Sequence, residues 1–292
     1  RTMHSRRLSI VGVGLLGGSL GLALRALEDL PWQVTGYGHR QASLQAALEI
    51  GAIDRAADDL ATAVADADMV VLCTPVGLFE GLLTKMAPHL KAGAIVTDVG
   101  STKRSIVAAA KCLLPDGVRF LGSHPMAGSE KRGVEFARTD LFQGATCIVT
   151  PTPETGADTL DAVESLWRSL GMQVVRLSPE DHDRLLADVS HLPHALAAAL
   201  VAMQKPDALP LAGKGFLDTT RIAGGDGALW RDILLDNRDN LRDSIARLRD
   251  QLARLLTMLD EGQAKELARW LDAAAARRQD LLQQKLREVN PD

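Results

Sequence analysis

The feature that most constrains this chain is a glycine-rich turn between an apolar run and a helix-forming segment. The sequence G-V-G-L-L-G overlaps the end of the apolar run Arg7–Val13 and opens a helical stretch. In that setting Gly12 makes the tight turn, Gly14 lets the backbone approach a pyrophosphate, and Gly17 permits close packing of helix on strand. The helix N-terminus then faces the phosphate charge, which favours a dinucleotide site over a simple strand–helix turn. The predicted cofactor residues of this turn are Gly12, Gly14, Leu15, Leu16 and Gly17.

Short apolar runs alternate with helical segments over the first 177 or so residues. Strands that alternate with helices in this way form right-handed βαβ units and a mainly parallel sheet. The runs are nearly continuous in apolar residues, as expected where helices cover both faces of a sheet. The predicted strands are Arg7–Val13, Gln33–Tyr37, Met69–Cys73, Ala94–Asp98, Val118–Gly122, Thr146–Thr150 and Gln173–Leu177.

From Pro179 onward the pattern changes, because apolar residues, chiefly leucines, recur at helical spacing and β-type runs almost disappear. We therefore predict an α/β fold class with two domains. A Rossmann-type, mainly parallel sheet domain covers residues 1–178, and an all-α C-terminal dimerisation domain covers residues 179–292. The helical leucines exceed what a domain of this size would bury, which predicts a homodimer formed through the helical domain.

Composition and charge argue against several classes of binding partner. The net charge of −4 is spread over both signs without a basic block, which argues against nucleic acid or an anionic membrane as a partner. Three cysteines lie far apart without the spacing of a metal site, so we expect free thiols and no metal. No run approaches the roughly 18 apolar residues of a membrane span. The segment Arg1–Ser5 is polar and unlike a signal peptide, so we expect a cytoplasmic protein.

The end of the second predicted strand bears on the choice of cofactor. An Asp or Glu there would bind the ribose 2′-hydroxyl of NAD, but this chain has Gly38, His39 and Arg40. The missing carboxylate removes repulsion of a 2′-phosphate, and the planar fork of Arg40 can pair with one. The sequence therefore favours NADP over NAD, with His39 and Arg40 at the site. The alternative is a solvated arginine that starts a helix.

Four further groups of polar residues mark candidate sites. Three of them follow predicted parallel strands, and open α/β sheets bind ligands at the carboxyl ends of such strands. Thr74 and Pro75, in the first group, are predicted to contact the cofactor. His124 is a candidate general base, because the ordinary histidine pKa of about 6.5 is close to working pH; a structural histidine is the alternative. The groups are Cys73–Pro75, Asp98–Lys103, Ser123–Lys131 and Ser190–His194.

Taken together the motifs resemble one family. G-x-G-x-x-G-G-S, D-V-G-S-T-K, S-H-P-M-A-G-S-E, S-H-L-P-H and D-T-T-R-I-A occur in the order and approximate spacing of prephenate and arogenate dehydrogenases of tyrosine biosynthesis, and W-R-D-I follows them. The resemblance extends over nearly the whole chain. It implies the oxidative decarboxylation of prephenate or arogenate by hydride transfer to NAD(P)+, which yields 4-hydroxyphenylpyruvate or tyrosine with carbon dioxide and needs no metal.

The resemblance also implies residue roles. His124 would accept the proton of the ring hydroxyl, and Ser101 would orient that hydroxyl beside the nicotinamide, so Ser101 has both a catalytic and a cofactor role. Arg221 would bind a substrate carboxylate. Asp183 matches an acidic position at the pocket entrance. The implied substrate-binding residues are Ser190, His191, His194, Arg221 and Glu130.

The Ser190–His194 group admits two interpretations. Ser190 and His194 are four residues apart and share one face of a helix, although Pro193 would kink that helix. For His191, a packed or capping histidine is as good an interpretation as a substrate contact.

Two other functions remain as alternatives. β-Hydroxyacid dehydrogenases and imine reductases combine similar domains but rely on a lysine or an aspartate/tyrosine pair in the helical part, and Tyr37, the single tyrosine here, lies in the second predicted strand. A regulator that binds NADP without turnover would need the glycine turn but neither His124 nor the Ser190–His194 group.

Overall fold

A computed structural model describes residues 6–27, 32–129 and 131–289 of the chain. The chain divides into two compact units, Arg1–Arg238 and Asp239–Asp292. The division into domains 1–178 and 179–292 that the sequence suggests stays a prediction.

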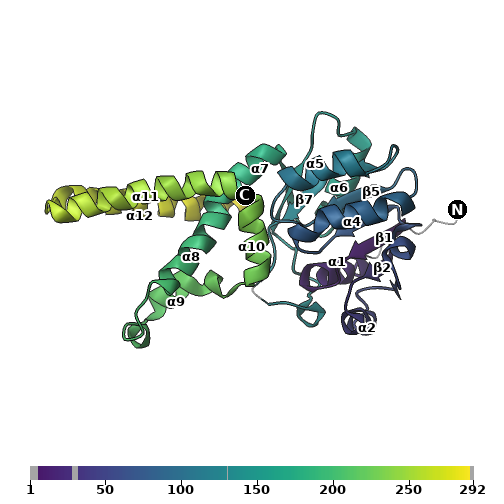
Figure 1. The fold of residues 1–292 in the computed structure, drawn as a ribbon, viewed down its shortest axis with the longest axis horizontal. Coiled ribbons are helices and arrows are strands. Elements are labelled where there is room, and N and C mark those ends of the chain that lie inside the picture. The colour runs from purple at the N-terminus through teal and green to yellow at the C-terminus, as the bar shows by residue number, and fades with distance from the viewer. Residues whose placement is uncertain (1–5, 28–31, 130, 290–292) are drawn as a thin grey trace. The chain divides into compact units, whose positions relative to one another are not determined.

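The first unit is built on a six-stranded parallel sheet (Figure 1). Its strand order is β3-β2-β1-β4-β5-β6, so the order reverses between β1 and β4. In open α/β sheets a ligand crevice forms at this reversal, outside the carboxyl ends of the strands. The two-residue strand β3 was missed by the sequence analysis because it is too short to show a pattern. The strands are β1 Arg6–Val11, β2 Trp32–Tyr37, β3 Arg55–Ala56, β4 Met69–Leu72, β5 Ile95–Asp98 and β6 Arg119–Phe120.

Helices cover both faces of this sheet because successive strand side chains point to opposite sides. Met69 and Val71 of β4 belong to one apolar core, and Val70 and Leu72 belong to the other. The first core contains side chains of α1, α2 and α6, and the second contains side chains of α3, α4 and α5. These helices are α1 Leu15–Arg25, α2 Gln41–Glu49, α3 Leu60–Val64, α4 Phe79–Met86, α5 Arg104–Leu113 and α6 Ala157–Ser169, with short 3-10 helices η1 Val76–Leu78, η2 Ala87–His89 and η3 Val134–Phe136.

A second, three-stranded sheet carries His124. Strand β7 (Gly122–Pro125) pairs antiparallel with β8 (Thr146–Thr150), and β8 pairs parallel with β9 (Gln173–Arg176). The sequence analysis predicted a single strand over Val118–Gly122 with His124 in the loop after it, and this was wrong. Strand β6 ends at Phe120 and β7 begins at Gly122, where a Cβ atom would lie 2.6 Å from the Thr150 hydroxyl.

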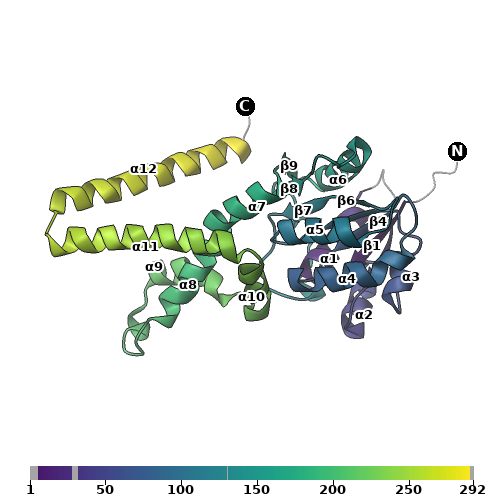
Figure 2. The same cartoon turned by 45° about the horizontal axis from the view of Figure 1, so that its top comes forward.

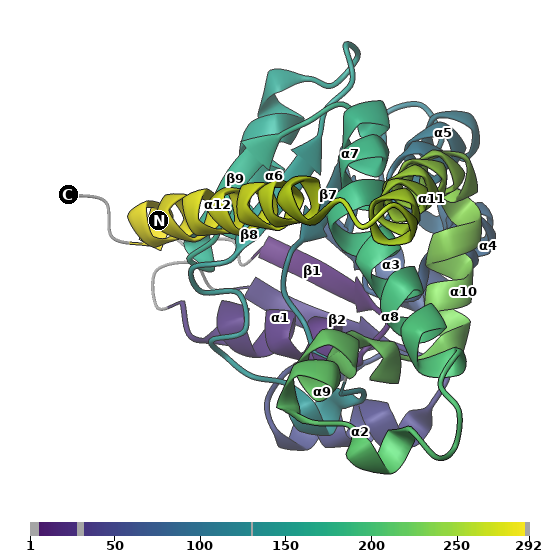
Figure 3. The ribbon, with the colours of Figure 1, turned by 90° about the vertical axis from the view of Figure 1, so that its left-hand side faces the viewer.

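Helices follow in the rest of the first unit, as predicted from the leucine spacing. Ser178 caps the first of them by accepting a hydrogen bond from the Asp181 N–H, and Pro179 occupies its first position. Figure 3 shows the main helices of this region. They are α7 Pro179–Leu186, the π-helical segment η4 Ala187–His191, α8 Leu192–Ala202, η5 Leu209–Leu211, α9 Lys214–Thr220, η6 Arg221–Gly224 and α10 Gly227–Asp236.

The π-helical segment changes one prediction. Ser190 lies within it and His194 follows in α8, so the two are not on a regular α-helix as their spacing suggested. The continuous helical run Pro179–Ala202 is long and apolar enough to cross a membrane on length and composition alone. Polar side chains of this run, including those of His182 and Asp183, are buried, whereas large apolar ones such as Val189 are exposed.

The second unit consists of two long helices. Helix α11 spans Arg238–Asp260, with all but its first residue in this unit, and α12 spans Ala264–Val289. They run in opposite directions (Figure 2). Gly262 has φ +64° in the connecting turn, and its N–H donates to the Leu259 carbonyl. A left-handed residue just after a helix is usually glycine, which explains the end of α11 at this point.

Candidate functional site

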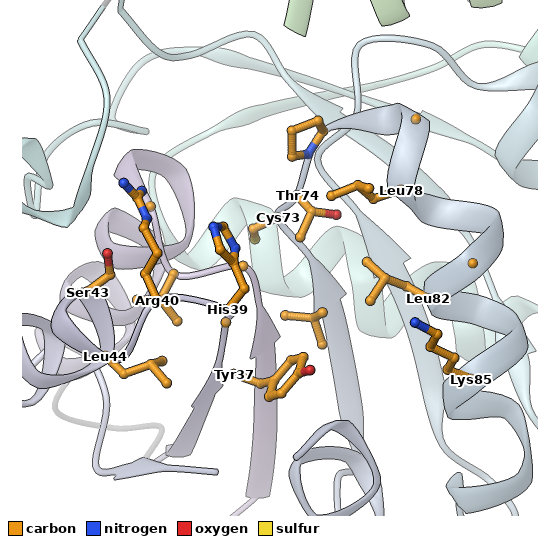
Figure 4. A pocket seen from close by; sticks show the side chains of 18 residues that line it. Tyr37, His39, Arg40, Ser43, Leu44, Cys73, Thr74, Leu78, Leu82 and Lys85 are labelled. Atoms are coloured by element: carbon orange, nitrogen blue, oxygen red, sulfur yellow. The ribbon is translucent and has the colours of Figure 1, made fainter. Parts of the chain in front are cut away.

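A cavity of about 400 Å³ lies where the sheet order reverses (Figure 4). The glycine turn, the end of β2, the residues after β4 and helix α4 line it. Leu15, Leu16 and Gly17 do not line the cavity, although Leu15 begins the helix that faces it. The predicted cofactor residues that do line it are Gly12, Gly14, His39, Arg40, Thr74 and Pro75.

Gly12 and Gly17 have the backbone geometry that the sequence predicted for the turn, and the role of Gly14 stays a prediction. Gly12 has φ +104°, and its N–H donates to the Tyr37 carbonyl, which fixes the tight turn. A Cβ atom on Gly17 would lie 2.2 Å from the Gly12 carbonyl oxygen, so helix and strand approach too closely for any side chain. A Cβ atom on Gly14 would meet no other described atom within 4 Å. That open space beside a helix N-terminus fits a bound pyrophosphate.

The two walls of the cavity carry different groups (Figure 4). His39, Arg40 and Ser43 form one wall at the end of β2 and the start of α2, and Lys85 of α4 lies on the opposite wall. Among the described residues that line the cavity there is no carboxylate. The Thr74 hydroxyl is buried and has no hydrogen-bond partner among the described residues, so it is available to a ligand. These residues fit a dinucleotide.

His124 begins a chain of buried hydrogen-bonding side chains. Its Nδ1 lies 2.9 Å from Nε2 of His182, and the His182 Nδ1 lies 2.8 Å from Oδ1 of Asp183. His182 and Asp183 come from α7, 58 residues or more along the chain from His124. All three side chains are buried. The arrangement joins the second sheet to the first helix that follows β9.

Backbone donors hold the far end of this chain. Asp183 Oδ1 accepts from the Lys103 N–H at 2.8 Å, and Oδ2 accepts from the Arg104 N–H at 3.0 Å and from the Arg104 Nε at 3.2 Å. Burial alone would raise the pKa of Asp183, but hydrogen bonds from His182 and from these backbone groups outweigh it and hold the pKa below its ordinary value. Asp183 is therefore a carboxylate at the N-terminus of α5.

A fully buried ion pair lies next to His124. The Lys103 ammonium pairs with Asp98 at the end of β5, and both side chains are fully buried. Asp98 also accepts hydrogen bonds from the backbone N–H groups of Gly100 at 2.8 Å and Ser123 at 3.2 Å. The Ser123 hydroxyl in turn donates to the Asp98 carbonyl at 2.5 Å. These contacts fix the segment that carries Ser101 against the strand that carries His124.

These surroundings determine the protonation of His124. Burial, followed by electrostatic repulsion from His182, Lys103 and His191, lowers the pKa of His124 well below its ordinary value. Burial also lowers the pKa of His182, although the hydrogen bond to Asp183 opposes that shift. His124 is consequently neutral at pH 7 and has one ring nitrogen able to accept a proton.

His191 is packed in the interior. Its Nδ1 lies 3.0 Å from the Asn237 side-chain nitrogen, which also donates to the Asp183 carbonyl at 2.6 Å. The Asn237 oxygen accepts from Arg104 at 3.2 Å, which assigns the amide orientation. Burial lowers the pKa of His191 to about 4. The geometry favours the packed histidine of the two interpretations, while a contact with substrate stays a prediction.

A second cavity of about 340 Å³ contains Arg221 and His194. The His194 ring stacks on Trp230 with ring centroids 3.5 Å apart and an interplanar angle of 11°. The His194 Nδ1 is buried without a hydrogen-bond partner among the described residues. Lys131 and Arg132, from the loop that follows β7, also line this cavity, and Arg132 forms an ion pair with Asp226. The cavity therefore combines basic groups with one stacked aromatic pair.

The remaining predicted residues are placed as follows. Ser101 and Ser190 are half-buried, and no described hydrogen bond fixes either hydroxyl. Glu130 lies outside the described residues. Asp183 was matched to the pocket entrance, which is wrong, because its side chain is 1% exposed and anchors His182. The roles of the predicted residues stay predictions.

Four residues of the site escaped the sequence analysis. Lys103 was part of a motif but received no role, and Ser43, His182 and Asn237 received none either. His182 and Asp183 stand next to each other just after a capped helix start, the one local signal that a polar pair begins this helix. Nothing in that signal connects them with His124.

Known proteins match both regions of this chain. Residues 20–176 match the family model described as "Prephenate dehydrogenase, nucleotide-binding domain", and residues 178–273 match "Prephenate dehydrogenase, dimerization domain". The prephenate dehydrogenase of Bacillus subtilis is 35% identical over 273 residues, which cover 91% of this chain and 73% of that protein.

Two solved structures show the same similarity over the full fold. The prephenate dehydrogenase of Aquifex aeolicus, in complex with hydroxyphenyl propionate and NAD+, is 35% identical with a TM-score of 0.90, and the match covers 96% of this chain and 100% of that chain. The arogenate dehydrogenase of Synechocystis is 34% identical with a TM-score of 0.81, covering 94% and 99% respectively.

Proposed function

The chain belongs to the prephenate dehydrogenase family, and we propose that it oxidatively decarboxylates prephenate, arogenate or both, with NAD(P)+ as hydride acceptor. The observation that carries this proposal is His124, a buried neutral histidine held at the end of a hydrogen-bonded chain. The two alternatives, a β-hydroxyacid or imine-type oxidoreductase and a non-catalytic regulator, are not favoured by these matches.

His124 acts as the general base in this proposal. Its free ring nitrogen accepts the proton of the substrate ring hydroxyl, and Ser101 orients that hydroxyl. Bound NAD(P)+ supplies the hydride acceptor. The carbon–carbon bond to the ring carboxylate then breaks, its electron pair enters the ring, and carbon dioxide leaves as the ring becomes aromatic. Prephenate gives 4-hydroxyphenylpyruvate and arogenate gives tyrosine.

Arg221 binds a carboxylate of the substrate. It lines the cavity that also contains His194 and Trp230, and a guanidinium pairs with a carboxylate through two parallel hydrogen bonds. In the same cavity Arg132 forms an ion pair with Asp226. Glu130, Ser190 and His191 complete the proposed substrate-binding set.

NADP is the proposed preferred cofactor. Arg40 follows β2 and Ser43 lies in the first turn of α2, beside the strand end where a dinucleotide places its adenosine ribose. The described cavity lining has no carboxylate to repel a 2′-phosphate. Ser43 adds a hydroxyl near the N-terminus of α2. Lys85 is on the other wall and is not assigned to the 2′-phosphate.

We further propose that the chain forms a homodimer through its helical region and acts in the cytoplasm. Large apolar side chains are exposed on α11 and α12 of the second unit, which leaves them for a partner surface. They are Ile245, Leu252, Leu256, Leu259, Leu271, Leu281, Leu282 and Leu286. Light scattering should give twice the mass of one chain, and a mass of one chain would contradict the dimer.

The proposed location has its own test: cell fractionation should recover the protein with cytoplasmic enzymes.

The test of the reaction is a steady-state assay with prephenate and arogenate, each with NAD+ and with NADP+, followed by reduced cofactor at 340 nm. The proposal expects turnover of at least one substrate and a higher kcat/KM with NADP+ than with NAD+. A lack of turnover in all four combinations, with the cofactor still bound, would contradict the proposed function.

A further inference from the structure

We infer that His182 and Asp183 are positioning residues that fix the tautomer of His124, so that its Nε2 is the atom that receives the substrate proton. This inference rests on the proposed function for the identity of the reaction. The tautomer itself follows from the hydrogen-bonded chain alone.

Both carboxylate oxygens of Asp183 accept hydrogen bonds from the start of α5, Oδ1 from the Lys103 N–H and Oδ2 from the Arg104 N–H and Nε. An ionised carboxylate has no proton to give. The 2.8 Å contact between Asp183 Oδ1 and His182 Nδ1 must therefore have its proton on His182.

The proton on Nδ1 of His182 determines the direction of the hydrogen bond between His182 and His124. His182 is fully buried, and its pKa is below the ordinary histidine value, so it is neutral and carries a single ring proton. Its Nε2 is then a lone pair. Nε2 lies 2.9 Å from Nδ1 of His124, so His124 must donate from Nδ1. Neutral His124 consequently keeps its lone pair on Nε2.

The same chain supports His124 after it has accepted the proton. The proton moves from the substrate hydroxyl to Nε2, and Nδ1–H stays where it is. The imidazolium then donates to His182, whose own Nδ1–H donates to the Asp183 carboxylate, so every contact keeps its polarity while the positive charge is present. No proton has to move along the chain.

The tautomer can be measured without any assay of activity. The protein is labelled with ¹⁵N-histidine, and long-range ¹H–¹⁵N spectra at pH 7.5 distinguish protonated from unprotonated ring nitrogens for its seven histidines. The His124 signals are identified by their loss in His124→Asn. The expected result is a protonated Nδ1 and an unprotonated Nε2. A proton on Nε2, or on both nitrogens, would overturn the inference.

Two variants of His182 then test whether the hydrogen bonds from His124 through His182 to Asp183 contribute to turnover. The amide of His182→Gln reaches the place of Nε2 and can accept from His124, whereas that of His182→Asn reaches the place of Nδ1 and can satisfy only Asp183. A positioning role predicts that Asn lowers kcat on the order of 100-fold while Gln stays within about tenfold of the wild type.

A merely structural role, in which Asp183 needs a buried partner, predicts the opposite order. Equal kcat values for the two variants, or a higher value for Asn, would overturn the role in turnover. The wild-type spectrum decides the tautomer even if neither variant folds. Because it is independent of turnover, it also separates failure of this inference from failure of the proposed reaction.

Discussion

The nucleotide cavity and the His124 chain are built on different principles. The first depends mainly on backbone conformation: Gly12 turns the chain, Gly17 lets helix and strand touch, and these residues lie within one short segment. In the second, side chains from β7 and α7 meet only after the chain has folded. The buried ion pair of Lys103 and Asp98 stabilises the segment whose groups contact both of these elements. A local backbone motif is visible in a sequence, whereas a distant side-chain network is not.

The largest expected effect is at the end of the side-chain network. His124→Asn removes the proton acceptor but keeps a polar side chain of similar size. General acid–base catalysis contributes about 10²–10⁴-fold, so kcat should fall by about that factor while KM changes little. Steady-state kinetics measures both. Unchanged affinity for NADP+ would show that the nucleotide cavity is intact, and retention of the wild-type kcat would contradict the assigned role.

Loss of the buried ion pair of Lys103 and Asp98 should lower stability more than a substitution at Gly14, which faces open space. Lys103→Met leaves the buried Asp98 carboxyl without its cation, and breaking a buried pair in this way costs about 3–5 kcal/mol. Thermal unfolding should therefore show a lower Tm. The double variant Lys103→Met with Asp98→Asn should recover part of the loss. A single variant as stable as the wild type would show that the pair is not structurally important.

Arg221→Ala tests whether the second cavity serves the substrate. Losing a charge-assisted pair to a carboxylate costs about 1.5–3 kcal/mol, so KM should rise about 10- to 100-fold with a smaller change in kcat. Lys111→Ala is the matched control, since it removes a positive charge from the exposed surface of α5. If KM stays constant in Arg221→Ala, the carboxylate is bound elsewhere.

The smallest expected effect is on the choice between cofactors. Arg40→Ala should lower kcat/KM for NADP+ about tenfold and leave the value for NAD+ nearly unchanged, because only NADP+ has the 2′-phosphate. Lys85→Ala, on the opposite wall, should not change the ratio of the two values. Equal losses with both cofactors in Arg40→Ala would contradict the assignment of this arginine.

These contrasts show what the sequence could predict. Strands β1, β2, β4 and β5 of the first sheet and the glycine turn were predicted because they depend on apolar runs and on backbone conformations that few residues tolerate. Strands β8 and β9 of the second sheet were also predicted, but β7 was missed, because Val118–Gly122 reads as one run although the chain enters the second sheet at Gly122. His182 was missed because its importance comes from a contact with a residue 58 positions away.

The pH dependence of stability has a definite sign. His124, His182 and His191 are buried, and their folded-state pKa values lie below that of an unfolded histidine. Protonation of each therefore favours the unfolded state. Their contribution to stability is therefore fully present above about pH 6.5 and declines as the pH falls. Circular dichroism over this range shows the pH at which the protein remains folded.

The central claim is that a buried neutral His124 takes the substrate proton, and the pH profile of kcat/KM tests it most directly over the range in which the protein remains folded. Because the pKa of His124 is well below 6.5, activity should stay on its plateau as the pH falls through 6.5 and decline only at lower pH. A decline centred at or above pH 6.5, or a profile unchanged in His124→Asn, would contradict the claim.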